Sequence, residues 1–417
     1  MVDLTDRERA IAAGASGEGA AMAMRIVAEA ARLMGAPRLI PIASAHIDGA
    51  LYHGDSGTLF AEKLAAGGAK VAVPATLNVG ALDLMGCSRV RLEGATRDMA
   101  KRLMRAHEEM GCAPTWTCAP YQAGHRPKQG TDVAWGESNA VAFCNSVLGA
   151  RTNRYGDFLD IACAISGRAP DYGLHRPDNR RAVFVLDVTA LNPALRDSDV
   201  IFPVLGGLFG RLAGDAIGVV DGFQGCCTDD RLKAFGAAAA SSGGVGLFHV
   251  AGCTPEAPTV EAALGSRPAA ETIEVTPAML TDALARLSTA QGDGVDAIAI
   301  GSPHLSAEEI GELDRLLAGR TTTRPIYACT GRHALKTIES EGTRGRLEKQ
   351  GVTFVLDTCV VVTPILPPGG SSLMTNSGKF AHYAPGNTGY AVHYGSLADC
   401  VESAVSGRLV RIDPIWR

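Results

Sequence analysis

The 417-residue sequence contains few aromatic residues, no block of basic residues and no long apolar run. Aromatic side chains make up 5% of the chain whereas glycine occurs 49 times, which suits a loop-rich α/β enzyme better than a binding scaffold. Because the net charge is −5 and Lys and Arg are dispersed, we expect neither nucleic acid nor a membrane as a partner. No apolar run reaches the roughly 18–20 residues that are needed to cross a bilayer.

A secretion signal is also missing from the sequence. The segment from Met1 to Ala10 has neither the basic start nor the apolar core of a signal peptide. We therefore expect a soluble, cytoplasmic protein. At about 100–200 residues per domain, the length allows two or three domains with sizeable cores.

The eleven cysteines form no CxxC pair and no zinc-finger spacing. Their odd number, in a chain without an export signal, argues against a disulfide framework. The default interpretation of any one of them is a small buried apolar side chain. They are Cys87, Cys112, Cys118, Cys144, Cys163, Cys226, Cys227, Cys253, Cys329, Cys359 and Cys400.

The segment from residue 295 to 359 alternates between strand and helix patterns. Apolar runs predict strands at Val295–Ile300, at Arg324–Ala328 and from Gly351 towards Cys359, with helices at Ala307–Leu317 and His333–Gln350 between them. Consecutive strand–helix–strand units favour a parallel sheet, in which the loops at the carboxyl ends of the strands lie along one edge.

Two thiols, a hydroxyl, an imidazole and a guanidinium follow these strands. Ligands bind at the carboxyl edge of open α/β sheets, so we expect these side chains to face one crevice. The combination predicts a metal or cluster site in an enzyme. The residues are Ser302, His304, Cys329, Arg332 and Cys359.

The N-terminal part predicts further β-loop-α units. We expect helices near 6–34, 56–67 and 96–110, and strands at Pro37–Ala43 and Lys70–Val73. The loops after the two strands carry His46, Asp48 and Asn78. Hydrogen bonding is the stronger interpretation of His46 and Asp48, and a metal-binding pair is the weaker one.

We expect four parts along the chain. These are an N-terminal α/β domain with substrate loops at 1–180, a middle α/β scaffold domain at 181–290, a parallel-sheet unit at 291–366 and a C-terminal segment completing the site at 367–417. In the last part we expect a polar loop at Ser371–Lys379 and a terminal helix at Cys400–Ser406.

Two polar segments are candidates for binding. The run from Trp135 to Arg154 is rich in amides, hydroxyls and guanidinium groups. It predicts either a satisfied polar network that holds two domains together, with Asn139, Asn145 and Ser146 on one helix face, or a carboxylate or phosphate site at Arg151 or Arg154. The run Thr375–Lys379 lacks the frame of a phosphate loop, but Ser377 and Lys379 suit general-base work or anion binding.

Cys118 precedes Ala119 and Pro120, where the chain must turn and expose the preceding residue. It is therefore a better ligand candidate than Cys144 or Cys163, for which the pattern predicts helix positions.

Several long motifs, in the same order, resemble the large-subunit domain of the aconitase X family of the aconitase superfamily. The resemblance covers most of the chain and implies an aconitase-like multi-domain α/β fold with parallel or mixed sheets and a site in the inter-domain cleft. The matching segments are Ser44–Gly49, Pro74–Asn78, Thr117–Tyr121, Ala134–Arg154, Gly167–Pro170, Ser241–Gly243 with His249, Thr254–Ala257, Asp357–Cys359 and Asn376–Lys379.

The resemblance implies a dehydratase with an iron–sulfur cluster, of the [2Fe-2S] or the [3Fe-4S]/[4Fe-4S] type, ligated by Cys118 and Cys359. The phosphomevalonate dehydratases of the family have a cysteine where this chain has Ser302. Cys329 is the first substitute that we expect for this third ligand, and Cys253 is the second.

The resemblance implies substrate contacts at the loop Gly49, Ala50 and Leu51, at Asn78 and at Lys379. From the residue types we also expect His46, Asp48 and Arg151 at the substrate, with Ser377 and Lys379 as the catalytic candidates: Ser377 as a base, and Lys379 either lowering its pKa or pairing with the substrate carboxylate. Gly49-Ala50-Leu51 replaces a Gly-Val-Ser sequence of the phosphomevalonate enzymes and removes a hydroxyl that would bind phosphate.

We therefore expect conversion of cis-3-hydroxy-L-proline to Δ1-pyrroline-2-carboxylate. The alternatives are a mevalonate 5-phosphate dehydratase large subunit and a cluster-free binding protein on the same scaffold. The resemblance further implies a small swivelling domain, as a separate subunit or outside this sequence.

Overall fold

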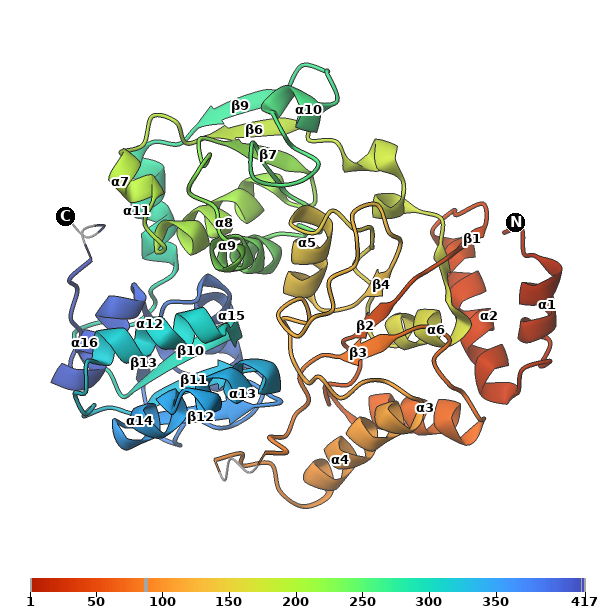
Figure 1. Cartoon of the computed structure of the whole chain (residues 1–417), viewed down its shortest axis with the longest axis horizontal. Helices are drawn as coiled ribbons and strands as arrows, with labels where there is room; N and C mark the ends of the chain where they lie inside the picture. Colours follow the sequence, from red (N-terminus) through yellow and green to blue (C-terminus); the bar gives the residue numbers. More distant parts are fainter. Residues whose placement is uncertain (1, 86–88, 414, 416–417) are drawn as a thin grey trace. The chain divides into compact units, whose positions relative to one another are not determined.

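The computed structural model describes residues 2–85, 89–413 and 415, so Cys87 lies outside the described residues. The chain divides into two compact units. Unit 1 comprises the residues up to Leu82 together with Leu92–Arg181, and unit 2 comprises Asp83–Arg91 and the chain from Ala182 onward. Figure 1 shows the path of the chain through the helices and strands of each unit.

Unit 1 contains a three-stranded parallel sheet in the order β3-β2-β4 and an antiparallel pair, β1 with β5. The strands are β1 Leu39–Pro41, β2 Ala45–Ile47, β3 Ala75–Leu77, β4 Ala134–Trp135 and β5 Arg168–Pro170. The helices are α1 Asp6–Ala12, α2 Glu18–Leu33, α3 Asp55–Ala66, α4 Gly94–Glu109, α5 Ser138–Ser146 and α6 Leu159–Ser166.

Two sequence predictions in unit 1 were wrong. The single helix expected near 6–34 is two helices, because the chain turns at Gly17, whose φ of 92° lies in the left-handed region that favours glycine. The residues Lys70–Val73, where a strand was expected, have irregular backbone structure, and the segment Ala75–Leu77 that follows forms β3 instead. Backbone pairing with β2 placed the strand at Ala75–Leu77, and the apolar pattern of the sequence alone did not reveal this position.

Unit 2 contains two parallel sheets, ordered β8-β7-β6-β9 and β12-β11-β10-β13-β14. The strands are β6 Phe184–Asp187, β7 Gly218–Asp221, β8 His249–Val250, β9 Glu271–Glu274, β10 Ala297–Leu305, β11 Ile326–Thr330, β12 Val352–Leu356, β13 Ser372–Thr375 and β14 Ala391–Tyr394. The helices are α7 Pro193–Arg196, α8 Ile201–Ala213, α9 Asp229–Ser242, α10 Val260–Leu264, α11 Pro277–Arg286, α12 Ala307–Leu317, α13 Arg332–Ser340, α14 Thr343–Lys349, α15 Gly378–Thr388 and α16 Leu397–Ser406.

The predicted parallel sheet is confirmed by β10, β11 and β12, which α12, α13 and α14 connect. Helix α12 has the predicted bounds because Ser306 and Glu309 form a capping box at its start. The polar loop expected at Ser371–Lys379 was wrong, since it forms β13 and the first turn of α15. The segment from residue 367 thus adds two strands to the sheet that residues 291–366 begin, and the four-part division itself stays a prediction.

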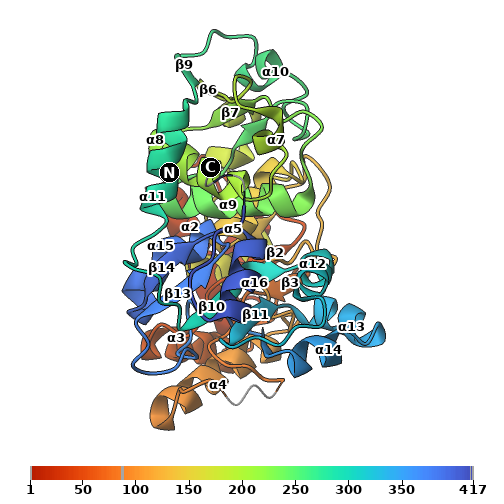
Figure 2. The same ribbon diagram turned by 90° about the vertical axis from the view of Figure 1, so that its left-hand side faces the viewer.

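Helices α8 and α9 lie side by side, and α15 packs against α9 within unit 2 (Figures 1 and 2). Their packing relies on small residues: a Cβ on Gly206 would lie 2.3 Å from the carbonyl oxygen of Phe235. Glycine at residue 206 therefore allows the backbones of α8 and α9 to approach closely. Among the described residues, no helix is both long and apolar enough to span a membrane.

Candidate active site

In unit 1, polar residues gather where the three parallel strands β3, β2 and β4 end. Asp48 follows β2, Asn78 follows β3 and Gly136 follows β4. The backbone N–H of Gly136 donates to the carbonyl of His46 at 2.8 Å, which continues the ladder to the edge of the sheet. The carboxyl edge of a parallel sheet is the usual position of a ligand site in α/β proteins.

A chain of hydrogen bonds leads to His46, which is fully buried. Ser44 Oγ lies 2.8 Å from Nε2 of His125, and Oγ1 of Thr76 lies 2.8 Å from Nδ1 of both His125 and His46. Burial lowers the pKa of His46 well below its ordinary value, and the neighbouring His125 lowers it further. Nε2 of His46 has no hydrogen-bond partner among the described residues, which leaves one buried polar atom to be satisfied by a ligand or water.

Asp48 and Asn78 are joined directly, because Nδ2 of Asn78 donates to Oδ1 of Asp48. Oδ1 of Asn78 is buried and has no hydrogen-bond partner among the described residues. The predicted substrate residues Gly49, Ala50 and Leu51 follow Asp48, and Ala50 is fully buried. This edge therefore presents a carboxylate, an unsatisfied amide oxygen and apolar side chains close together.

Cys118 lies in a loop next to Thr117, whose backbone N–H donates to the carbonyl oxygen of Leu77 at 3.1 Å. Trp116, two residues before it, has φ 45°, an uncommon conformation for a non-glycine residue. The carbonyl of Cys118 accepts a hydrogen bond from Nδ2 of Asn139 at 3.2 Å. Cys118 is 6% exposed, so the thiol is buried on this constrained turn, and the expectation that the turn before Ala119 and Pro120 would expose it was wrong.

The polar network around Asn145 lies within unit 1 and does not join two domains as expected. Asn145 exchanges two hydrogen bonds with the backbone of Thr152, at 2.9 and 3.0 Å, and its Oδ1 accepts from the buried Arg180 at 3.0 Å. Arg151 is half-buried, and its Nε has no hydrogen-bond partner among the described residues. Asn145 is therefore committed to structure, whereas an anion role for Arg151 stays a prediction.

In unit 2, Cys359 follows β12 in a tight loop and is 5% exposed. Its carbonyl accepts hydrogen bonds from Val362 N at 3.2 Å and from Thr363 N at 3.1 Å. Asp357 has φ 61°, so each of the two predicted cluster cysteines stands two residues after a non-glycine residue with positive φ. Such conformations cluster at binding and catalytic sites, where the surrounding structure maintains them.

His304 lies behind this loop and is fully buried. Because its Nε2 is 3.1 Å from the carbonyl oxygen of Thr358, Nε2 carries the proton and donates. The pKa of His304 is lowered to about 3, chiefly by burial and also by His333, Lys233 and Lys379, against the opposing effect of the hydrogen bond to Thr358. The imidazole is therefore neutral at physiological pH and orients the backbone next to Cys359.

Lys233, on α9, is buried between two carboxylates. It donates to Asp230 Oδ1 at 2.7 Å and to Oε2 of Glu309, and its Nζ lies 3.4 Å from the carbonyl of His304. A cavity of about 40 Å³ in unit 2 is lined by Lys233 together with Ser302 and Ser377. This ion-pair network joins α9 to the strand that carries Ser302.

Ser377 caps α15: its Oγ accepts from Phe380 N at 3.0 Å and donates to the carbonyl of Ser302. Lys379 stands in the first turn of the same helix, close enough to His304 to lower the pKa of that imidazole. The two predicted catalytic residues are thus on one helix N-terminus beside Ser302, where the helix dipole favours negative charge.

Cys329 was expected on a loop, and this position was wrong. It lies inside β11, fully buried, and pairs with Val355 of β12. Ser302 and His304 lie in an irregular part of β10, where the register against β11 shifts between Ile300 and Leu305. A ligand role for Cys329 stays a prediction.

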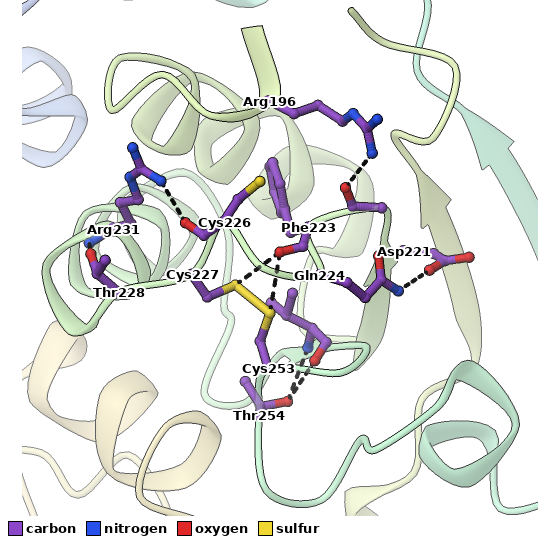
Figure 3. Close-up of a disulfide and its surroundings, with 12 residues drawn as sticks. Arg196, Asp221, Phe223, Gln224, Cys226, Cys227, Thr228, Arg231, Cys253 and Thr254 are labelled. Carbon is purple, nitrogen blue, oxygen red and sulfur yellow. Dashed lines mark hydrogen bonds between the residues drawn. A yellow bond between two sulfur atoms is a disulfide. The ribbon is translucent and has the colours of Figure 1, made fainter. Parts of the chain in front are cut away.

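Cys253 and Cys227 form a disulfide, which corrects two expectations (Figure 3). The chain does contain a disulfide, and Cys253 in this bonded form cannot supply a thiolate to a cluster. The bond joins the loop after β7 to the loop after β8, which are neighbouring strands. Both sulfurs lie near the carbonyl of Phe223, at 3.6 Å for Cys227 and 3.4 Å for Cys253. Only the tertiary structure brings these two loops together.

Cys118 in unit 1 and Cys359 in unit 2 are each a buried thiol on a constrained loop, and thiolates are the usual ligands of iron–sulfur clusters. Among the described residues, no group of three or more His, Cys, Asp and Glu side chains is arranged to hold a lone metal ion. The sequence analysis missed Thr76, His125 and Asp160. Their hydrogen bonds support the residues at the carboxyl ends of the unit 1 sheet from distant parts of the chain.

Comparisons with known proteins agree with the motif order. Residues 1–178, 182–285 and 295–406 match the first, second and third domains of aconitase X, respectively. The chain is 42% identical over 414 residues to cis-3-hydroxy-L-proline dehydratase of Pseudomonas aeruginosa, covering 98% of this chain and 71% of that protein. It is 38% identical over 386 residues to the phosphomevalonate dehydratase large subunit of Methanothermobacter thermautotrophicus, covering 91% of this chain and 93% of that protein.

A solved structure has the same fold. The crystal structure of Thermococcus kodakaraensis aconitase X in its holo-form matches with a TM-score of 0.86 and 33% identity, covering 97% of this chain and 100% of that chain. The predicted resemblance and the multi-domain α/β fold are confirmed by these matches. This protein belongs to the aconitase X family.

Proposed function

We propose that this chain is an iron–sulfur-dependent hydro-lyase that converts cis-3-hydroxy-L-proline to Δ1-pyrroline-2-carboxylate. The observation that carries the proposal is the higher identity to the hydroxyproline enzyme, 42% over 98% of the chain, than to the phosphomevalonate large subunit, 38% over 91%. The loop Asp48-Gly49-Ala50-Leu51 supports it, because an acid and two apolar side chains are poor partners for a phosphate.

The reaction removes a proton from C2 and hydroxide from C3 of the ring, and water leaves. The resulting enamine gains a proton at C3 and loses one from nitrogen, which gives the Δ1 imine. Asp48, held by Asn78, would face the ring ammonium. Lys379 or Arg151 would bind the carboxylate.

Ser377 is the proposed base. Its Oγ already accepts the backbone N–H of Phe380, and such donors at a helix N-terminus stabilise an alkoxide. On losing its proton it must give up the bond to the carbonyl of Ser302. His46 and Gly49 would complete the binding surface, through an unsatisfied ring nitrogen and a backbone that can approach the substrate closely.

Cys118 and Cys359 would hold the cluster, with Cys329 as the first candidate for a third ligand. When bound, an iron–sulfur cluster supplies a Lewis acid for the departing hydroxyl. We also propose a small subunit as a partner, which the name "large subunit" of the phosphomevalonate relative supports. The cytoplasm is the proposed compartment, where such thiols stay reduced.

A dehydration assay tests the proposed function. Anaerobically reconstituted protein is incubated with cis-3-hydroxy-L-proline or with mevalonate 5-phosphate, each with and without a co-expressed small subunit. We expect the imine product from hydroxyproline only. Turnover of mevalonate 5-phosphate alone would replace the proposed substrate, and a colourless, iron-free protein after reconstitution would contradict the whole class.

A further inference from the structure

Asp160 lies at the start of α6 and is fully buried beneath the Asp48–Gly49 loop. Its Oδ2 accepts the backbone N–H groups of Asp48, at 2.6 Å, and of Gly49, at 3.0 Å. Its Oδ1 accepts the N–H of Ile161 at 2.6 Å. One carboxylate therefore holds two consecutive amides of a loop that lies 112 residues away in the sequence.

The loop fits closely against the strand end beside it. A Cβ on Gly136 would lie 2.6 Å from the Cβ of Asp48, 2.9 Å from its backbone nitrogen and 3.1 Å from Oδ2 of Asp160. These contacts leave no room for a side chain at residue 136. The backbone of Asp48 is thus fixed from two sides, by the absence of a side chain at Gly136 and by the carboxylate of Asp160.

The electrostatics of Asp160 are unusual for a carboxylate that accepts three N–H groups. Its pKa is raised to about 7, chiefly by burial and also by the carboxylates of Asp48 and Asp157, against the lowering effect of the bonds from Gly49 and Ile161. The thiols of Cys112 and Cys163 also interact with it. Among the described residues it forms no ion pair, so its contacts to the loop are its main stabilising interactions.

We propose that Asp160 is a positioning residue, which fixes the Asp48–Gly49 loop so that the Asp48 carboxylate and the Gly49 backbone face the substrate. The inference rests on the proposed function of this loop as the substrate site. Asp160 acts through Asp48 and does not touch the substrate itself. The ionised form accepts all three amides, whereas protonation turns one oxygen into a donor and weakens the hold on the loop.

Kinetics of Asp160→Asn over a range of pH test the proposal, with Asp157→Asn as the matched control. Asp157 is exposed and three residues away, so this variant makes the same charge change without removing an acceptor of the loop amides. Because the Asp157 carboxylate raises the pKa of Asp160, the variant should keep the pH-dependent rise but shift it to lower pH. Displacing a substrate group can cost about a hundredfold in rate, so we expect a loss of that order in kcat/KM for Asp160→Asn and little change for Asp157→Asn.

The pH profile separates positioning from a merely structural role. Wild-type kcat/KM should rise with pH through about 7, as Asp160 ionises, and this rise should be absent from Asp160→Asn. Wild-type kinetics and pH profile in the folded Asp160→Asn variant would overturn the proposal.

Hydrogen exchange on the wild-type protein keeps the test decisive if the variant does not fold. The amides of Asp48 and Gly49 should be protected from exchange. After correction for the pH dependence of intrinsic exchange rates, their protection should be stronger above pH 7 than below it. Exchange of both amides at unprotected rates would also overturn the proposal. This measurement needs no substrate, so it is unaffected if the wild type fails to dehydrate hydroxyproline and the proposed function is wrong.

Discussion

Arg332 donates to both carboxylate oxygens of Asp357, at 2.6 and 2.9 Å, where β11 and β12 end. The side chain of Asp357 is fully buried and that of Arg332 is 34% exposed. Burial raises the pKa of Asp357, and Arg332 opposes this shift. Oδ2 of Asp357 also accepts the N–H of Leu84 at 3.2 Å, so the same carboxylate holds the backbone at Leu84 within unit 2. The pair fixes the backbone two residues before Cys359.

Replacing Arg332 by Met should destabilise unit 2 and loosen the Cys359 loop. Removing one partner of a buried ion pair typically costs about 3 kcal/mol, because the remaining charge has no compensation. Urea unfolding followed by circular dichroism measures the loss, and iron content after reconstitution reports on the loop. Arg315→Met is the control, since Arg315 pairs with Glu312 on an exposed helix face and should change stability little. Equal stability of the two variants would contradict this account.

Cys118→Ser and Cys359→Ser should each lose most of the iron and sulfide that the wild type binds. Both thiols are buried on constrained loops, and a hydroxyl is a poor ligand for an iron–sulfur cluster. Iron and sulfide assays with visible absorbance, after anaerobic reconstitution, give the result independently of activity. Cys144→Ser is the control, because Cys144 is buried within α5. Full iron and sulfide in Cys359→Ser would remove this residue from the ligand set.

Lys379→Met should leave the fold intact and lower kcat/KM for hydroxyproline about 10- to 100-fold. A loss of this size corresponds to the free energy of one charge-assisted hydrogen bond. The side chain stands in the first turn of α15, after the cap residue Ser377. Lys336→Met, on the exposed face of α13, is the control for loss of a positive charge. If both variants keep wild-type kcat/KM, Lys379 does not bind the substrate.

His107 should make the stability of unit 1 depend on pH. Burial lowers its pKa from 6.5 to about 4, and it contacts the carbonyl of Leu103 at 3.0 Å. Because the folded pKa is depressed, its contribution to stability is present above about pH 6.5 and is lost as pH falls towards 4. At pH 5 the loss amounts to about 2 kcal/mol.

Urea midpoints at pH 7 and pH 5 for the wild type and His107→Gln measure this contribution. The wild type should lose more stability than the variant between the two values. Parallel pH dependence of both proteins would show that His107 does not cause the effect.

The Cys227–Cys253 disulfide should stabilise unit 2 against unfolding. It closes a loop with a sequence separation of 26, for which chain entropy predicts about 3 kcal/mol. Intact mass under non-reducing conditions should be lower by two hydrogens than after reduction. Cys253→Ser should unfold at a lower denaturant concentration, and Cys226→Ser should not, since Cys226 is outside the bond. A wild-type mass that does not change on reduction would rule out the disulfide.

Local pattern was sufficient where neighbouring residues decide the structure. Helix α12 starts and ends as predicted, because Ser306 and Glu309 cap it and its apolar residues repeat at helical spacing. The order of strand and helix from residue 295 to 359 likewise determined the parallel sheet, since short crossovers leave few alternatives. The strand β3 and the strand β13 within Ser371–Lys379 depended on pairing with distant strands, which single-sequence pattern does not contain. The helix break before α2 depended on the left-handed backbone at Gly17.

The sequence by itself determined the family, the parallel-sheet class and the types of side chain available for dehydration, because these depend on ordered motifs and on residue chemistry. Only the tertiary structure decided which distant side chains hold the candidate site residues in position. Asp160 reaches the Asp48 loop across 112 residues, Thr76 joins His46 to His125, and Cys253 meets Cys227. These contacts arise because strand pairing and the packing of helices and loops bring residues together regardless of their separation along the chain, so no local signal marks them.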